Sequence, residues 1–287
     1  MYKKLDGNKV RCLACAHYCV IQEGKTGICG VRENIGGELQ LLVYGKPAAI
    51  QVDPIEKKPL YHFMPGTKIL SLGTFGCNFR CGFCQNWDIS QQRLSELGYR
   101  LQESDDWLPE RIVSYAVEHK IPSIAYTYNE PTIFVEYAYD IMVLAKEKGL
   151  KNVFVSNGYE SKETLDYIGP YLDAINIDLK SFSNGFYQKN CGAKLQPVLD
   201  TIRRVHKMKI WQEITTLVIP GENDVEEELK QIADFIVSVD PGIPWHLSRF
   251  HPDYKMMNKG VTSYESLVRV REIGLAAGLK YVYLGNV

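Results

Sequence analysis

Three cysteines of the segment GCNFRCGFCQNW (76–87) lie within eight positions of one another, at Cys77, Cys81 and Cys84. Three thiolates on so short a loop can bind three irons of a [4Fe–4S] cluster. The sequence places no fourth cysteine nearby, so the remaining iron would be open to another molecule. Open coordination positions are typical of reactive metal sites, because structural sites are usually closed by protein ligands. The spacing therefore predicts a reactive iron–sulfur cluster.

A zinc knuckle is the alternative for these three cysteines. Zinc would need a fourth ligand from a histidine or from a distant cysteine. Structural zinc sites are usually built from paired Cys-x-x-Cys knuckles, whereas gaps of three residues and then two separate the cysteines here. The spacing favours the iron–sulfur cluster over zinc.

A second group of cysteines lies near the N-terminus, at Cys12, Cys15, Cys19 and Cys29. Four thiols in so short a polar stretch predict a closed metal site with four protein ligands. Tetrahedral sulfur ligation suits both zinc and an iron–sulfur cluster. The sequence does not separate the two, and we prefer zinc. His17 could replace one of these cysteines, and the isolated Cys191 is expected to be an ordinary buried thiol.

The overall composition indicates a globular protein with a substantial core. Apolar residues make up 45% of the 287 residues, and 33 Lys and Arg balance 34 Asp and Glu. Such a chain lacks the basic surface with which proteins bind nucleic-acid phosphates. The polar start MYKKLDGNKV lacks a signal peptide, and no long apolar run predicts a membrane span. We therefore expect a cytoplasmic protein without nucleic-acid or membrane partners. In that reducing compartment, clustered cysteines bind metals or do redox chemistry.

The elements that position these residues follow a regular alternation from residue 68 onward. Short apolar runs predict strands at 68–75, 123–128, 152–157, 174–179, 210–219, 245–250 and 281–284. Apolar residues at helical spacing predict helices between them, at 109–120, 131–149, from about 161, and at 196–207, 229–239 and 264–278. This alternation predicts an α/β fold with a parallel sheet and outer helices.

The number of units decides between the α/β architectures. Six strand–helix units are fewer than the eight of a closed TIM-type barrel. We therefore predict a partial (β/α)6 TIM-type barrel, with a doubly wound open sheet as the alternative. In both folds the loops at the carboxyl ends of the strands carry the chemistry, and the loop at 77–84 directly follows the first predicted strand.

Residues 1–67 have a different pattern and are predicted to form a small Cys-rich, metal-binding unit. The strand-like runs 39–45 and 48–52 flank a Gly-Lys-Pro turn, which predicts a β-hairpin. So short a segment buries too little core to be stable without a metal. We therefore divide the chain into this unit, 1–67, and a barrel core, 68–287.

The motif CNFRCGFC (77–84) resembles the CxxxCxxC motif of radical S-adenosylmethionine (SAM) enzymes, including the aromatic Phe83 before the last cysteine. The segments VDPIEKKPLYHFMPG (52–66), CQNW (84–87) and TYNEPT (127–132) resemble pyruvate formate-lyase activating enzyme-like proteins of the AmmeMemoRadiSam-system radical SAM group. The resemblance covers essentially the whole chain. It implies that the open iron binds SAM, and that an electron passed through the cluster cleaves SAM to methionine and a 5′-deoxyadenosyl radical. That radical would abstract a hydrogen from the substrate.

The resemblance also implies which residues bind SAM at the ends of the predicted strands. Asn129 and Glu130 stand where the family has a Gly-Gly-Glu segment facing the SAM amino group. Ser156 and Asn157 resemble the Thr-Asn-Gly segment, and Asp178 and Lys180 the Asp-Leu-Lys segment, which approach the SAM carboxylate and ribose. Phe83, Ile219 on the adenine side and His246 near the ribose complete the expected set of cofactor-binding residues.

Each of these residues also has an ordinary structural interpretation. Glu130 could simply open the following helix, where an acidic group is favourable, and Asn157-Gly158 could be a common turn. Asp178 and Lys180 are spaced by two and so share one face of a strand. They are functional only if that face lines the barrel interior, where unpaired charges are costly. A lone histidine such as His246 is often structural.

Three classes of function remain open. The first is a radical SAM oxidoreductase that forms a radical on a protein glycine, as glycyl-radical activating enzymes do. The second keeps the radical SAM chemistry but modifies a small molecule or another protein. The third is an electron carrier or scaffold, which would not need the residues expected to bind SAM. Either enzyme would need a one-electron reductant of the flavodoxin or ferredoxin type. Glycyl-radical activating enzymes often carry extra cluster cysteines after the loop, whereas here they precede it, which favours the second class over the first.

Overall fold

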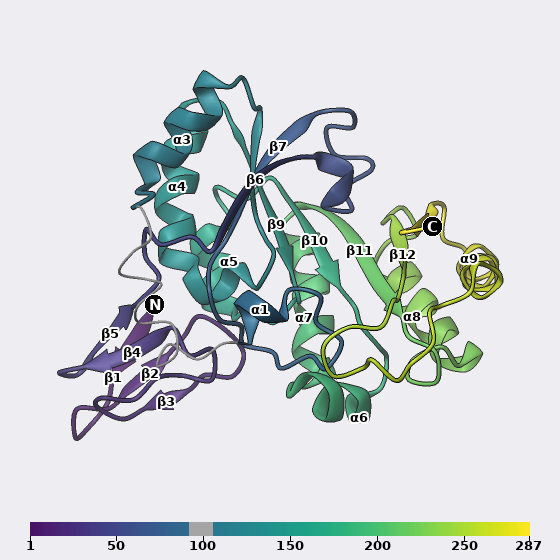
Figure 1. The fold of residues 1–287 in the computed structure, drawn as a ribbon, viewed down its shortest axis with the longest axis horizontal. Coiled ribbons are helices and arrows are strands. Elements are labelled where there is room, and N and C mark those ends of the chain that lie inside the picture. Colours follow the sequence, from purple (N-terminus) through teal and green to yellow (C-terminus); the bar gives the residue numbers. More distant parts are fainter. Residues whose placement is uncertain (92–105) are drawn as a thin grey trace.

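The computed structural model describes residues 1–91 and 106–287 (Figure 1). An eight-stranded sheet forms its centre, in the order β13-β12-β11-β10-β9-β8-β7-β6. Neighbours from β7 to β13 are parallel, and β6 pairs antiparallel with β7 at the edge. The strands are β6 (Ala49–Pro54), β7 (Lys68–Gly73), β8 (Ser123–Tyr126), β9 (Lys151–Ser156), β10 (Ala174–Asp178), β11 (Trp211–Val218), β12 (Trp245–Arg249) and β13 (Val282–Gly285).

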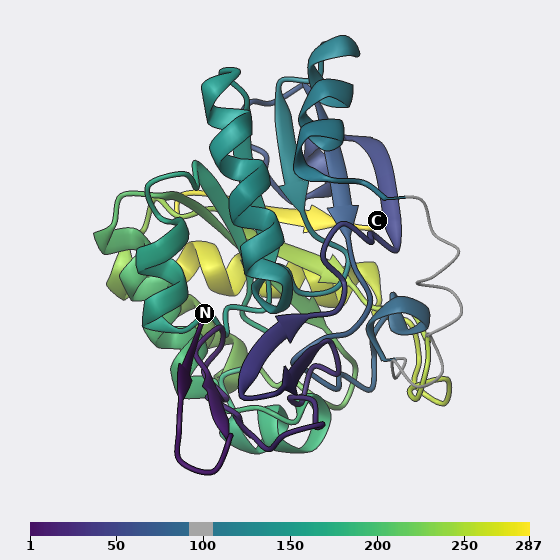
Figure 2. The same ribbon diagram turned by 90° about the vertical axis from the view of Figure 1, so that its left-hand side faces the viewer.

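Helices follow the parallel strands and lie around the outside of the sheet (Figure 1 and Figure 2). They are α1 (Trp87–Ser90), α3 (Pro109–Glu118), α4 (Val135–Glu147), α5 (Lys162–Ile168), α6 (Asn184–Phe186), α7 (Leu195–Lys207), α8 (Glu226–Val239) and α9 (Tyr264–Ala277). Shorter turns are the 3₁₀ helices η1 (Ile55–Lys57) and η2 (Pro131–Phe134) and the π-helical turn η3 (Tyr187–Cys191). Local signals set several boundaries: the Ser161 and Ser263 side chains cap α5 and α9, and Gly278 ends α9 in a left-handed conformation.

Side chains of the parallel strands alternate between the two faces of the sheet, because successive residues of a strand point to opposite sides. Leu70 and Leu72 of β7 lie in the main core, together with apolar residues of the outer helices. Ile69 instead joins a separate inner apolar group (Ile55, Leu60, Ile69, Ala125, Val153 and Ala174). The segment 55–60 thus fills the barrel near the strand beginnings, and the free interior lies toward the carboxyl ends of the strands.

The strand order confirms the predicted fold class. The parallel strands follow one another in sequence order without a reversal, as in a partial barrel, whereas a doubly wound sheet reverses its order at a switch point. Each strand predicted from residue 68 onward is present within a few residues of its expected bounds. The fold is therefore an α/β partial barrel with additional small sheets at the N-terminus.

The N-terminal segment contains two small sheets. One joins β1 (Tyr2–Lys4), β2 (Val10–Cys12) and β3 (Val20–Ile21), and the other joins β4 (Arg32–Ile35) and β5 (Glu38–Leu41). The hairpin expected between 39–45 and 48–52 is wrong, because β5 pairs backward with β4 and β6 pairs forward with β7. Both strands find their partner across a nearby turn, and Gly36 and Gly37 supply the positive φ angles of the first turn. The division at residue 67 stays a prediction, although the main sheet itself begins at Ala49.

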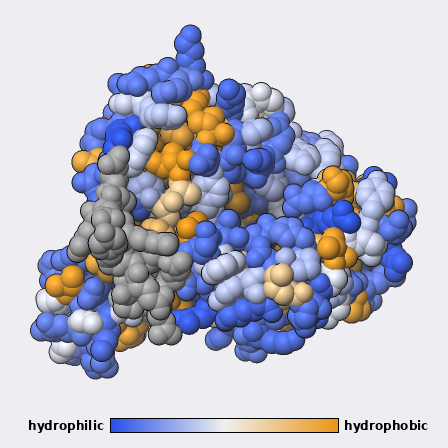
Figure 3. All heavy atoms as spheres, viewed as in Figure 1, coloured by the Kyte–Doolittle hydropathy of each residue, from blue (hydrophilic) through white to orange (hydrophobic). Residues whose placement is uncertain are grey.

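The surface is mostly polar on the face seen in Figure 3, where apolar side chains gather only in separate patches. Within residues 1–91 and 106–287, no helix combines the length and the apolar character needed to cross a membrane. The largest apolar side chains that are fully buried, such as Trp245, Tyr126 and Phe154, lie on the central strands. The main core therefore lies between the sheet and its helices.

Candidate functional site

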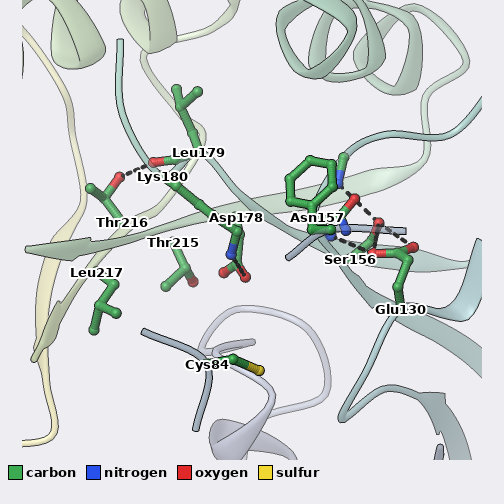
Figure 4. Close-up of polar contacts among 12 residues, drawn as sticks. Cys84, Glu130, Ser156, Asn157, Asp178, Leu179, Lys180, Thr215, Thr216 and Leu217 are labelled. Atoms are coloured by element: carbon green, nitrogen blue, oxygen red, sulfur yellow. Dashed lines mark hydrogen bonds and ion pairs between the residues drawn. The ribbon is translucent and has the colours of Figure 1, made fainter. Parts of the chain in front are cut away.

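A cavity of about 600 Å³ lies inside the barrel. The loop after β7 supplies one wall, and residues at the carboxyl ends of β8 to β12 supply much of the rest. Figure 4 shows Cys84 on the loop, with Asp178 and Thr215 of the strands pointing toward it across the cavity. Among the expected site residues, the lining includes Cys77, Cys81, Phe83, Cys84, Asn129, Ser156, Asn157, Asp178 and Lys180. Topology thus brings most of the predicted residues together.

The three cysteine sulfurs are held by local hydrogen bonds. The Cys77 sulfur accepts from the Phe79 backbone N–H at 3.4 Å, and the Cys84 sulfur contacts the Ser90 hydroxyl at 3.1 Å. Burial raises the pKa of Cys77 well above its usual range, and the Glu130 carboxylate raises it further. Burial also raises the pKa of Cys84. Thiols kept protonated in this way release protons when a metal binds them, so iron binding here should be favoured by higher pH.

Gly76 marks the point where the loop meets the N-terminal segment. Its φ angle is +87°, and a Cβ atom there would lie 2.6 Å from the Cys29 carbonyl oxygen. The Gly76 carbonyl accepts a hydrogen bond from the Asn129 side chain at 2.7 Å. Only glycine combines this backbone conformation with so close an approach. The loop and the N-terminal segment are therefore packed directly against each other.

Asp178 and Lys180 lie on the inner face of the barrel, as their functional interpretation requires. Lys180 Nζ lies 2.7 Å from Asp178 Oδ2, and it lies over the Phe83 ring at 5.8 Å. Burial lowers the pKa of Lys180, but the Asp178 carboxylate and the Cys81 thiolate outweigh burial and hold that pKa well above its usual range. Lys180 is thus a permanent positive charge beside the cysteine loop.

Glu130 does not line the cavity, and its expected contact with SAM stays a prediction. Its fully buried carboxylate accepts hydrogen bonds from Thr132, from the Ser156 hydroxyl at 3.0 Å and from the Asn157 backbone N–H at 2.8 Å. Figure 4 shows Glu130 beside Ser156 and Asn157. The carboxylate therefore ties the end of β8 to the end of β9, behind the cavity wall that Ser156 and Asn157 form. The N-cap interpretation holds as well, since the Glu130 side chain accepts from the Thr132 N–H.

Asn129 lines the cavity, but its side chain is already engaged with the cysteine loop. Its Oδ1 accepts from the Thr74 backbone N–H at 3.2 Å, and its Nδ2 donates to the Gly76 carbonyl. The preceding residue, Tyr128, has a positive φ of 70°, which is rare for a non-glycine residue. This conformation turns the chain at the end of β8, and Asn129 then fixes the start of the loop.

His246 and Ile219 do not line the cavity, and their contact with SAM stays a prediction. His246 is buried, and its Nε2 lies 2.7 Å from Glu213 Oε2. Ser248, two residues later on the same face of β12, lines the cavity instead. Two residues of a strand span about 7 Å, so His246 lies about that much deeper in the barrel than Ser248, toward the amino ends of the strands. The Ile219 backbone N–H is bonded to the Asn223 side chain at 2.7 Å.

Several lining residues were not identified from the sequence. Thr215, Leu217 and Ser248 follow the alternation that selected Asp178 and Lys180, so the same pattern could have found them. The residues of β6 and η1 carried no such signal: Gln51, Asp53, Lys57 and Lys58 line the cavity from outside the strand–helix repeat.

The far wall of the cavity carries a compact charged group. Lys58 Nζ lies 2.9 Å from Asp53 Oδ2, and the Tyr128 hydroxyl donates to the same oxygen at 3.1 Å. Burial would raise the pKa of Asp53, but the hydrogen bonds from Lys58 and Tyr128 lower it to about 2. Lys57 adds a second positive charge to this wall. The wall therefore offers charge and hydrogen bonding opposite the strand ends.

The four N-terminal cysteines converge on a second, small cavity. Cys12, Cys15, Cys19 and Cys29 all line a space of about 10 Å³. Burial raises the pKa of Cys15 far above its usual range, and the nearby Cys12, Cys29 and Cys19 thiolates raise it further. His17 also lines this space, but its Nε2 contacts the Asn78 carbonyl at 2.9 Å. In residues 1–91 and 106–287, no three His, Cys, Asp or Glu side chains are already arranged to hold a single metal ion.

Comparisons with known proteins agree with this geometry. The model of the Radical SAM superfamily matches residues 71–236, more than half of the chain. The chain is 47% identical, over its full length and 84% of the relative, to the uncharacterized protein MJ0808 of Methanocaldococcus jannaschii. It resembles the crystal structure of a domain of pyruvate-formate lyase-activating enzyme from Bacteroides vulgatus (25% identity, TM-score 0.50, 56% of this chain and 98% of that one). The fold also matches a radical SAM methyltransferase from Sphaerobacter thermophilus (16% identity, TM-score 0.60, 77% of this chain and 67% of that one).

Proposed function

The chain belongs to the radical SAM superfamily, and we propose that Cys77, Cys81 and Cys84 bind the [4Fe–4S] cluster with which it cleaves SAM. One observation carries this proposal: all three thiols line a single cavity of about 600 Å³ together with polar strand-end residues. Three sulfurs on one wall suit three irons, and the cavity leaves room for a ligand at the fourth. When bound, the cluster supplies the electron that splits SAM into methionine and a 5′-deoxyadenosyl radical.

We assign the binding of SAM to the polar residues of the cavity. Lys180 is a permanent cation, and we place the SAM carboxylate on it, because charged hydrogen bonds of this kind are strong. Asp178, Ser156 and Asn157 offer acceptors and donors for the amino group and the ribose hydroxyls. Phe83 lies beside Lys180 and supplies apolar contact. Together these side chains would orient SAM and exclude water from the reacting bond.

We assign positioning roles to Glu130 and Asn129, which the resemblance places among the residues that bind SAM. Glu130 fixes Ser156 and Asn157 through hydrogen bonds to both. Asn129 fixes the first residues of the cysteine loop through Thr74 and Gly76. Neither role requires contact with SAM, and both require the exact geometry of an amide or carboxylate.

We propose zinc as the metal of the four N-terminal cysteines, with a second iron–sulfur cluster as the competing assignment. The space between the four thiols is about 10 Å³, roughly the volume that one water-sized sphere needs. Four thiolates are also a common ligand set of structural zinc. Four thiolates around zinc would carry a net negative charge, which the buried Arg32 beside them would partly balance.

We propose that the substrate donates a hydrogen atom from the side of the cavity lined by Asp53, Lys57 and Lys58. None of these three residues is among those to which we assign SAM binding, so this side of the cavity is left for the substrate. The likeness to pyruvate formate-lyase-activating enzyme makes a protein glycine one candidate, whereas the position of the extra cysteines before the loop favours a small molecule or another protein. From the resemblance of segment 52–66 we propose membership of the AmmeMemoRadiSam group. The electron would come from a flavodoxin- or ferredoxin-type reductant.

The test is the response of the reduced protein to SAM. The protein is reconstituted anaerobically with iron and sulfide and reduced, and its electron paramagnetic resonance spectrum is recorded with and without SAM. We expect the spectrum to change on SAM addition, because SAM would occupy the open coordination position. An iron-loaded protein that does not bind SAM, and whose spectrum does not change when SAM is added, would contradict the proposal and favour an electron carrier.

A further inference from the structure

The eighth cysteine, Cys191, lies directly against the cysteine loop. It was expected to be an isolated thiol, but it is fully buried at the end of η3. The Arg80 N–H donates to the Cys191 carbonyl at 2.8 Å, and the Gly82 N–H donates to the Asn190 carbonyl at 3.1 Å. These two hydrogen bonds flank Cys81, the middle cysteine of the loop. The backbone thus holds Cys191 at one fixed position beside Cys81.

Aromatic contacts strengthen the same attachment. The Phe79 ring packs edge-on against Tyr187 with a centroid distance of 6.2 Å, and Phe83 packs against Phe186 at 5.9 Å. Both pairs join the loop to the turn that carries Cys191, one on each side of Cys81. The placement of Cys191 is therefore built into the fold.

The side chains of the two cysteines are in contact. The Cys191 thiol lies close enough to the Cys81 sulfur for the two side chains to interact. Cys191 does not line the cavity, whereas Cys81 does. Cys191 therefore lies behind Cys81, away from the coordination position that faces SAM, and is not placed to be the fourth iron ligand.

We propose that Cys191 donates an S–H···S hydrogen bond to the Cys81 thiolate and so raises the reduction potential of the [4Fe–4S] cluster. This inference rests on the proposed function, because it requires Cys81 to bind iron. A cysteine that binds iron has lost its proton, so the one proton left in the pair is on Cys191. A hydrogen bond to a ligand sulfur stabilises the more negative, reduced state. Cys191 is thus a positioning residue that acts through Cys81.

The other two loop cysteines support this role by their own partners. Cys77 receives the Phe79 N–H, and Cys84 contacts the Ser90 hydroxyl. With the proposed bond from Cys191, each sulfur of the loop has a hydrogen-bonding partner. Those of Cys77 and Cys84 come from within the loop and α1, whereas that of Cys81 comes from a segment more than 100 residues away. Ser90→Ala is accordingly the matched variant, since it removes a comparable bond to Cys84.

The experiment compares wild type, Cys191→Ala, Cys191→Ser and Ser90→Ala as reconstituted full-length proteins without SAM. Iron is counted, and the reduction potential is measured by titration followed by electron paramagnetic resonance. The signal of Cys81→Ala, which lacks this cluster, is subtracted. We expect equal iron in all four, a more negative potential for Cys191→Ala and for Ser90→Ala, and a potential nearer wild type for Cys191→Ser, because its hydroxyl can still donate.

A spectroscopic signature separates hydrogen bonding from a packing effect. In D₂O, electron–nuclear double resonance of the reduced wild type should show an exchangeable deuteron coupled to the cluster, and Cys191→Ala should lose that coupling. Equal potentials and equal deuteron couplings in wild type and Cys191→Ala would overturn this inference while leaving the proposed function intact. Loss of iron from Cys191→Ala and Cys191→Ser alike would also overturn it, because Cys191 would then be a ligand. Absence of iron at the loop of wild type would refute the proposed function itself.

If alanine disturbs the packing, Cys191→Ser carries the test. Its oxygen donor differs in strength and length from the thiol, so its potential and its deuteron coupling should both differ measurably from wild type. Identical values for both quantities would overturn the inference.

Discussion

At the scale of single residues, Lys180 is a cation of the cavity that lies on the side of the cysteine loop. Lys180 lies beside the cysteine loop and pairs with Asp178 at 2.7 Å. We predict that Lys180→Met lowers SAM affinity by about ten-fold or more while iron content is unchanged, because a charged hydrogen bond contributes about 1.5–3 kcal/mol. Equilibrium binding of SAM measures the effect. Lys207→Met, on the exposed side of α7, is the control and should bind SAM normally.

Replacement of Glu130 should lower the stability of the fold more than it lowers the affinity for SAM. Its carboxylate accepts hydrogen bonds from Thr132, Ser156 and Asn157. Glu130→Gln replaces one acceptor oxygen by a donor that faces other donors, and an unsatisfied buried group costs about 1–3 kcal/mol. We predict a lower free energy of unfolding by this amount, with a weaker loss of SAM affinity and normal iron content. Unchanged stability in chemical denaturation would show that these hydrogen bonds contribute little.

The buried Glu160 predicts a pH dependence. Burial, with a further contribution from Glu130, raises the pKa of Glu160 to about 8. The folded state then binds more protons than the unfolded state between pH of about 4.5 and 8. Stability should fall across this range as pH rises, by at most about 1.4 kcal/mol per pH unit.

Thermal unfolding as a function of pH tests this expectation. Glu160→Gln is neutral at every pH, so its unfolding temperature should lose the part of the pH dependence that Glu160 causes. If the variant and the wild type follow parallel curves from pH 5 to 8, Glu160 is charged in the folded protein.

At the scale of elements, the sequence revealed the alternation that builds the site but not the depth of each residue within it. Asp178 and Lys180 were found because charges at a strand end stand out from an apolar run. His246 does not line the cavity, whereas Ser248 of the same strand does; the sequence could not show this depth, because a motif fixes the face of a strand but not its register against neighbouring strands. The hydrogen bonds of Glu130 to Ser156 and Asn157 could not be predicted, because these partners belong to the end of another strand and only the parallel pairing of β8 with β9 brings them together.

Gly76 offers a test of how the loop is attached to the N-terminal segment. An added Cβ would lie 2.6 Å from the Cys29 carbonyl oxygen, and φ is +87°. We predict that Gly76→Ala lowers the free energy of unfolding by about 1–3 kcal/mol and reduces metal content at both cysteine groups. Gly82→Ala in the same loop meets only ordinary contacts, the nearest at 3.7 Å. That control should keep normal iron content; equal losses in the two variants would contradict the packing argument.

At the scale of the whole molecule, the N-terminal segment acts as a cap attached to the barrel. The Thr164 hydroxyl donates to the Ala14 carbonyl at 2.7 Å, and His17 contacts the Asn78 carbonyl next to Cys77. Arg32 pairs with Glu136 of α4. These long-range contacts could not be read from the sequence, because no local pattern marks them. The cysteine spacing predicts that a metal bound to the four thiols organises this segment, and this stays a prediction.

Removal of the metal proposed for this cap should loosen it. We predict that Cys29→Ser lowers zinc content by about one ion per chain and lowers the unfolding temperature, because the four thiols would no longer be held together. Iron at the loop should persist in freshly reconstituted protein. Metal analysis of the same sample decides the identity: loss of about four irons instead of one zinc would assign a second cluster.

The production of 5′-deoxyadenosine tests the central claim most directly. Wild type and Cys81→Ala are reconstituted anaerobically, given dithionite and SAM, and assayed for 5′-deoxyadenosine, with iron and zinc counted on the same samples. We predict that wild type forms 5′-deoxyadenosine and that Cys81→Ala forms none while it keeps its N-terminal metal. Formation at the parent rate by Cys81→Ala, or an iron-loaded wild type that neither binds nor cleaves SAM, would contradict the assignment of the three-cysteine loop as the reactive centre.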